Sequence, residues 1–183
     1  VDIAEALDNY RRRKRTQVVS LQAPTGAGKT IIAAGLIEDI FFGATLADGT
    51  TFEEQPEAIF VWLSDSPELN VQSKEKIELK TSRLTFGQCV TIAEDSFDME
   101  MLEDGHIYFL NTQKISRNKK LTQHSDGRMY TIWETLDNTV QNKSDRLYFI
   151  IDEAHRGAKS KREAGTDTTI MQRFIKGYEY TEN

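Results

Sequence analysis

The chain has 183 residues, which is enough for one domain with a sizeable core. Hydrophobic residues make up 38% of it and charged residues 28%, the composition of a globular protein rather than a disordered one. The formal net charge of -6 argues against a domain that coats nucleic acid by bulk electrostatics, so any such contact must follow a local stripe. No apolar run approaches the roughly 20 residues of a membrane span. The chain has a single cysteine, Cys89, so it cannot form an internal disulfide, and this pattern fits a cytoplasmic protein. We expect Cys89 to be a small buried hydrophobic residue.

Short apolar runs alternate with longer stretches of helical periodicity. In chain order, the runs predict strands at 17–21, 58–63, 89–92, 107–110 and 147–151, and the periodic stretches predict helices at 30–42, 67–79, 130–140 and 168–178. Residues 43–56 and 111–128 are polar and are expected to be connections. In the first helix, the side chains expected to face inward are those of Ile31, Ile32, Leu36, Ile37 and Ile40. Strands that are apolar on both faces and separated by helices indicate an α/β fold with a mostly parallel sheet covered on two sides.

The first expected strand leads into a glycine-rich stretch that opens the first helix. It reads Ala23-Pro24-Thr25-Gly26-Ala27-Gly28-Lys29-Thr30, a Walker A motif in the strand-loop-helix context that this motif needs. The glycines let the backbone curl around a triphosphate, and the helix points the positive end of its dipole at the same phosphates. Lys29 adds a full positive charge, and the Thr30 hydroxyl can bind Mg²⁺. The stretch from Thr25 to Thr30 therefore predicts an ATP site, although the motif usually begins with glycine where this chain has Ala23.

A second motif ends the last expected strand of the sheet. Residues 147–151 are apolar and are followed by Asp152-Glu153-Ala154-His155. Because ligands bind beyond the carboxyl ends of parallel strands, we expect Asp152 to lie in the same crevice as the glycine-rich loop. There Asp152 can hold Mg²⁺ alongside Thr30, and Glu153 can orient or deprotonate the attacking water. The alternative, in which Asp152 and Glu153 only cap a helix, is weakened by the preceding Walker A motif.

Together the two motifs resemble those of superfamily-two DEAD/DEAH-box helicases and translocases. Three stretches are most similar to the motor of restriction enzymes, in particular the Res subunit of type III enzymes: residues 60–64, 109–115 and 152–157. The resemblance implies a three-layer RecA-like P-loop NTPase domain that uses ATP and Mg²⁺. It also implies a catalytic set of Lys29, Asp152, Glu153 and His155, in which His155 couples the nucleotide state to a partner domain. The competing interpretation of His155 is an ordinary exposed histidine.

The same resemblance suggests nucleic-acid contacts at two turns. Ser66 and Pro67 are similar to a motif that touches the nucleic-acid backbone, and Asn111 and Thr112 to a later motif that contacts the same strand. Backbone N–H groups and short hydroxyls at helix starts suit phosphate contacts that do not read sequence. The structural alternative is that Ser66 and Asn111 are plain helix caps.

Several pieces of the family pattern are missing from this chain. No Ser-Ala-Thr-type motif follows Asp152, no glutamine before the first strand supplies an adenine-reading motif, and the second RecA-like domain with its arginine finger is absent. We therefore expect residues 1–183 to form the N-terminal RecA-like domain of a longer motor, with about 16 residues of N-terminal flank. The expected partners are DNA, as a duplex, the missing C-terminal RecA-like domain and a modification or specificity subunit, with no membrane. The alternatives are a nucleotide-binding regulatory module, a DEAH-type helicase acting on RNA, and an ATPase acting on proteins.

Overall fold

The computed structural model describes residues 6, 9, 12–13, 16–22, 24, 27–49, 51–116 and 118–152. Within them lie three long helices, α2 (Lys29–Phe42), α3 (Pro67–Lys80) and α4 (Ile132–Lys143). The strands are β1 (Ala44–Thr45), β2 (Thr51–Phe52), β3 (Ile59–Ser64), β4 (Cys89–Thr91), β5 (Ile107–Asn111) and β6 (Leu147–Ile151). Two 3₁₀ turns, η1 (Thr112–Ile115) and η2 (Lys120–Thr122), follow β5. The helix expected at 168–178 lies outside the described residues.

The four longer strands form one parallel sheet in the order β4-β5-β3-β6. Its two inner strands, β3 and β5, are buried along their whole length, as the continuous apolar runs predicted. In the register of the sheet, Ser64 at the end of β3 lies opposite Asn111 at the end of β5. The carboxyl ends of β3 and β5 therefore lie side by side at one edge of the sheet.

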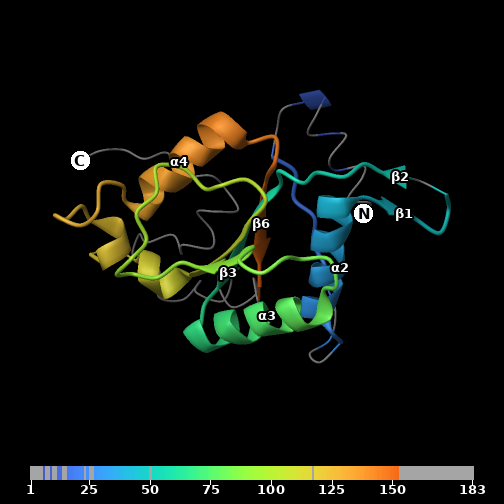
Figure 1. The fold of residues 1–183 in the computed structure, drawn as a ribbon, viewed down its shortest axis with the longest axis horizontal. Helices are drawn as coiled ribbons and strands as arrows, with labels where there is room; N and C mark the ends of the chain where they lie inside the picture. Colours follow the sequence, from blue (N-terminus) through green and yellow to red (C-terminus); the bar gives the residue numbers. More distant parts are fainter. Residues whose placement is uncertain are drawn as a thin grey trace, which may run out of the picture.

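Helices cover both faces of this sheet and make three layers (Figure 1). Alternate residues of β3 point to opposite faces, as the strand period of two requires. Phe60 and Trp62 pack with α2 and α3, whereas Val61 and Leu63 pack with α4 and the segment that contains η2. The expected α/β architecture with a mostly parallel, doubly covered sheet is confirmed. Among the described residues, no helix is long and apolar enough to cross a membrane.

The strand expected at 17–21 is wrong. Residues 16–22 have no regular secondary structure, and Val18, Val19 and Leu21 expose 70%, 39% and 55% of their surface. A short run of apolar residues becomes a strand only where a sheet accepts its backbone hydrogen bonds and a core covers its side chains. In the described sheet these residues receive neither.

The inward face expected for the first helix is partly wrong. Ile37 and Ile40 are buried, but Ile31 and Ile32 each expose 49% of their surface. The buried residues of α2 begin at Ala34, so the sheet covers the helix only from its second turn onward. The first turn of α2, which carries the end of the Walker A motif, is left accessible.

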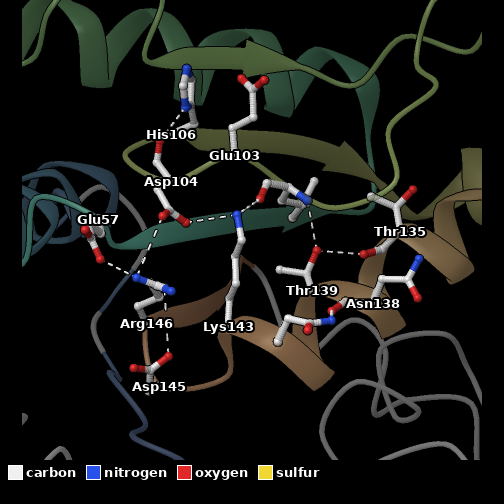
Figure 2. Close-up of polar contacts among 12 residues, drawn as sticks. Glu57, Glu103, Asp104, His106, Thr135, Asn138, Thr139, Lys143, Asp145 and Arg146 are labelled. Atoms are coloured by element: carbon white, nitrogen blue, oxygen red, sulfur yellow. Dashed lines mark hydrogen bonds and ion pairs between the residues drawn. The ribbon is translucent and has the colours of Figure 1, made fainter.

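Charged side chains tie together the connections that lead into β3, β5 and β6 (Figure 2). Arg146, just before β6, pairs with Glu57 before β3, and its Nη1 lies 3.7 Å from Asp104 Oδ2 before β5. Lys143 Nζ, at the end of α4, lies 3.1 Å from Asp104 Oδ1 and donates to the Leu102 carbonyl at 2.8 Å. We call Glu57, Asp104, Lys143 and Arg146 the amino-edge cluster. It fixes three strand starts at the edge opposite to their carboxyl ends.

Candidate nucleotide site

A glycine in a left-handed conformation begins α2. Gly28 has φ 77° and ψ 27°, a region that other L-residues enter at a cost of roughly 1–2 kcal/mol. Its carbonyl accepts hydrogen bonds from the N–H groups of Ile31 and Ile32, at 2.8 and 3.0 Å, while the Ala27 N–H bonds the Pro24 carbonyl at 3.1 Å. This backbone turn places Lys29 and Thr30 in the first turn of the helix.

The amino end of α2 differs from those of the other two long helices. Ser66 caps α3 and is followed by Glu68, and Thr131 forms a capping box with Glu134 at the start of α4. By contrast, α2 has no side-chain cap and no acidic residue in its first turn. The first N–H groups of a helix have no partner inside it and carry the positive end of its dipole. The start of α2 is therefore suited to an external anion.

The direction of α2 brings its first residues to the carboxyl edge of the sheet. Near the end of α2, the Ile40 carbonyl accepts a hydrogen bond from the Gln55 N–H at 2.8 Å, and the Phe41 ring lies 5.1 Å from that of Phe60 at the start of β3. The end of α2 therefore lies beside the start of β3. Figure 1 shows the start of α2 and the tip of β6 toward the same, lower side.

Asp152 lies at that edge, directly after β6. Its N–H donates to the Leu63 carbonyl at 2.9 Å, which extends the parallel ladder between β3 and β6 by one bond. The carboxylate is partly exposed. The first turn of α2 and the tip of β6, which come from opposite ends of the described sequence, thus lie toward the same side of the fold (Figure 1). The chemical roles of Lys29, Thr30 and Asp152 remain predictions.

Four of the residues expected in the site, Thr25, Gly26, Glu153 and His155, lie outside the described residues. Among the described ones, no group of three or more His, Cys, Asp and Glu side chains could hold a metal ion by itself. A magnesium site built from Thr30 and Asp152 would therefore need phosphate oxygens and water to complete its ligands.

The first turn with expected nucleic-acid contacts follows β3. The Ser66 Oγ accepts from the Leu69 N–H at 3.5 Å and donates to the Glu68 carboxylate, and this hydrogen bond lowers the pKa of Glu68. Pro67 is exposed and opens α3. The Ser66 side chain thus has the capping role that was the structural alternative.

The second turn with expected nucleic-acid contacts follows β5. The Asn111 Oδ1 accepts from the Gln113 N–H at 2.8 Å and caps η1. Asn111 and Thr112 expose only 1% and 8% of their surface. The Gln113 side chain donates to the Asp65 carbonyl at 2.7 Å and so joins this turn to the one after β3. Sequence reasoning missed this bridge, because no local pattern links residues 48 positions apart.

The basic residues beyond Thr112 are partly neutralised. Lys120 Nζ pairs with Asp95 at 2.7 Å, which lowers the pKa of that carboxyl. Lys114 Nζ lies 3.4 Å from the Ile92 carbonyl. Arg117 lies outside the described residues. The charge of Lys120 is therefore compensated by Asp95, whereas the carbonyl contact of Lys114 leaves its charge in place.

Comparison with known families agrees with this geometry. The family model described as "Type III restriction enzyme, res subunit" matches residues 2–179, nearly the whole chain. No curated protein and no solved structure matches the chain. The parallel sheet, the glycine turn before α2 and the acidic end of β6 are features of a P-loop NTPase, whereas residues 16–22 do not form the strand that precedes the glycine-rich loop in that fold. The chain belongs to the family of type III restriction enzyme Res subunits, which are helicase-like P-loop ATPases.

Proposed function

We propose that this chain is the ATP-binding RecA-like domain of a DNA motor. Together with a second RecA-like domain it would hydrolyse ATP and drive translocation on DNA, or DNA remodelling, as part of a restriction enzyme. The observation that supports this most is the uncapped amino end of α2, with Lys29 and Thr30 in its first turn, directed toward the edge that carries Asp152. Family membership supports the general class, a nucleotide-using helicase-like ATPase.

The described residues fit a magnesium triphosphate. Gly28 precedes α2 in a left-handed conformation without a side-chain cap, and the first turn of α2 contains no acidic residue. In the proposed site Lys29 binds the β- and γ-phosphates and Thr30 and Asp152 hold Mg²⁺, directly or through water. Glu153 orients the attacking water, and His155 passes the nucleotide state to the partner domain. The metal ion neutralises charge that develops on the transferred phosphoryl group.

Binding of a fluorescent ATP analogue, with Mg²⁺, tests this site. Lys29→Ala should abolish detectable affinity, because it removes the only full positive charge in the first turn of α2. Lys76→Ala, on the exposed side of α3, is the matched control and should bind as wild type does. Glu153→Gln should retain binding and, in the intact motor, stop hydrolysis. Equal affinity of wild type and Lys29→Ala would overturn the proposed site.

We expect the isolated chain to hydrolyse ATP very slowly. In related phosphoryl-transfer systems, an arginine finger from a second domain contributes on the order of 10³–10⁵ in rate. Robust turnover by residues 1–183 alone, lost in Lys29→Ala, would contradict a mechanism shared between two domains.

The proposed nucleic-acid contacts lie on the two turns at the carboxyl edge. Asn111 and Thr112 are buried and Ser66 caps α3, so these contacts would use the backbone of the turns and the exposed Pro67. DNA stimulation of ATPase activity in the intact protein is the direct test. A rate that duplex DNA does not raise would favour a regulatory nucleotide-binding module, and stimulation by RNA alone would favour an RNA helicase.

A further inference from the structure

The end of α2 and the segment after α3 are joined by reciprocal hydrogen bonds. The Glu38 Oε1, in the third turn of α2, accepts from the N–H groups of Ser82 and Arg83, both at 2.9 Å. In the other direction, the Arg83 guanidinium donates to the Phe42 carbonyl at 3.3 Å. The same guanidinium lies 4.3 Å from the centroid of the Phe42 ring. We call these contacts of Glu38, Phe42, Ser82 and Arg83 the α2–α3 interlock.

In the interlock, side chains from one segment bond backbone groups at the end of the other segment. The Ser82 and Arg83 N–H groups follow the end of α3, where Thr81 already returns its own N–H and hydroxyl to the Ile77 carbonyl at 2.9 and 2.6 Å. The Phe42 carbonyl belongs to the last turn of α2, where carbonyl groups have no partner inside the helix. A carboxylate that accepts two N–H bonds and an arginine that caps a carbonyl are charge-assisted contacts, which are stronger than neutral ones.

The interlock also continues into the core. Ile77 of α3 is fully buried in the same cluster as Ile37 and Phe41 of α2. The two helices are therefore held by packing along their length and by hydrogen bonds at the point where α3 ends. Side chains packed this closely resist gradual deformation, so the pair is expected to shift as a unit.

We propose that the α2–α3 interlock couples the two ligand sites, and that Glu38 and Arg83 are positioning residues for this coupling. This inference rests on the proposed function, in which α2 begins at the nucleotide and α3 begins at the nucleic acid. A displacement of α2 when its first turn binds phosphate is carried by Glu38 to the end of α3, and along α3 to the Ser66–Pro67 turn. Neither Glu38 nor Arg83 belongs to the sequence motifs at the site.

The test measures the affinity of the chain for a short labelled DNA duplex with and without a non-hydrolysable ATP analogue and Mg²⁺. The ratio of the two dissociation constants is the coupling factor, and allosteric coupling in proteins is typically about 5- to 150-fold. We expect a factor in that range for wild type. In Glu38→Ala and in Arg83→Ala it should fall toward one, while the affinity for the analogue alone stays within about twofold of wild type, since neither residue lies in the first turn of α2.

Two further variants separate coupling from a general loss of structure. Glu38→Gln keeps an oxygen that can accept the same two N–H bonds, so it should retain most of the coupling. Glu78→Gln is the matched control, because Glu78 pairs only with Lys74 one turn away on α3, at 3.6 Å, among the contacts described. It should couple as wild type does. Circular dichroism shows which variants fold, and if Glu38→Ala does not, Arg83→Ala decides the question.

The outcomes distinguish this inference from the proposed function. Coupling that persists unchanged in both alanine variants overturns the inference and leaves the nucleotide site standing. Binding of the analogue without any effect on DNA affinity in wild type overturns the inference in the same way. If the wild-type chain binds no ATP analogue, both the inference and the proposed function are overturned. Loss of coupling in Glu38→Ala and Arg83→Ala, with Glu78→Gln normal, supports the inference.

Discussion

Thr139 of α4 makes a hydrogen bond whose loss should be measurable as a defined fall in stability. Its hydroxyl accepts from the Leu102 N–H at 2.9 Å and donates to the Thr135 carbonyl at 2.6 Å (Figure 2). Thr139 and Leu102 are both fully buried, at 0% exposure. In Thr139→Val the shape of the side chain is kept, but the Leu102 N–H loses its acceptor where water cannot replace it.

The size of the effect follows from two opposing terms. Leaving a buried N–H without a partner costs about 1–3 kcal/mol. Replacing the hydroxyl by a methyl group recovers part of this, since burial of one such group contributes about 0.8 kcal/mol. Valine and threonine are both β-branched and have similar helix propensities, so the helix itself contributes little. The expected net destabilisation is roughly 0.2–2.2 kcal/mol.

Urea unfolding of wild type, Thr139→Val and Thr139→Ser measures this difference. The serine variant keeps the acceptor and loses one methyl group, so it should be destabilised by packing alone, while the Leu102 amide stays protected from hydrogen exchange. In Thr139→Val the same amide should exchange faster. A valine variant as stable as wild type, with the Leu102 amide still protected, would refute the assignment of this bond to Thr139.

Three further predictions rest on single residues. Gly28→Ala should destabilise the chain by roughly 1–2 kcal/mol, because the φ of Gly28 is 77°. Gly35→Ala should stabilise it by about 0.5–1 kcal/mol, because Gly35 lies in the middle of α2 and nothing is within 4 Å of the added carbon. Thermal unfolding of both variants tests whether the two changes in stability have opposite signs. Burial raises the pKa of the Cys89 thiol to about 12, so iodoacetamide should label it slowly in the folded protein and fast in urea, and equal rates would contradict its burial. The N–H groups of Tyr130 and Met129 donate to the Asp98 carboxylate and lower its pKa. Asp98 therefore stabilises the fold at a pH above its pKa in the unfolded chain, and this stabilisation is lost as the pH falls through its pKa in the folded protein. In Asp98→Asn the free energy of unfolding should fall less steeply as the pH is lowered through the acid range. An unchanged pH dependence would show that Asp98 does not contribute to it.

Much of the sheet could be predicted because its strands have a strong local signal. The apolar run at 147–151 coincides with β6, and those at 58–63 and 107–110 match β3 and β5 to within one residue. Strands buried on both faces need such continuous runs. The start of α3 was also predictable, since Ser66 caps it and Pro67 occupies its first turn. The start of α4 was placed two residues early, although Thr131 and Glu134 have the spacing of a capping box.

The remaining features depend on contacts that local patterns do not encode. The hairpin of β1 and β2 consists of two-residue strands, too short for any periodicity, and it lies in the stretch expected to be a connection. The apolar run at 17–21 has the composition of a strand but is not one of the strands of the described sheets. The bond between Glu38 and Ser82 joins residues 44 positions apart.

The motifs predict a set of nucleotide-binding residues, but not how the helices and strands that carry them are arranged. The direction of α2 relative to β3 follows from packing of Phe41 on Phe60, not from the Walker A stretch itself. Likewise the short polar residues Ser66 and Asn111 fit either a ligand contact or a cap in the sequence, and only the hydrogen bonds show that both side chains serve as caps.

The amino-edge cluster lies at the edge of the sheet opposite to the one that carries the proposed nucleotide site. Glu57, Asp104, Lys143 and Arg146 hold the beginnings of three strands at the end of the sheet remote from Lys29 and Asp152. Because these ion pairs are partly exposed, added salt should weaken them. Substitutions in the connections before β3, β5 and β6 should therefore change the stability of the domain more than its proposed nucleotide site.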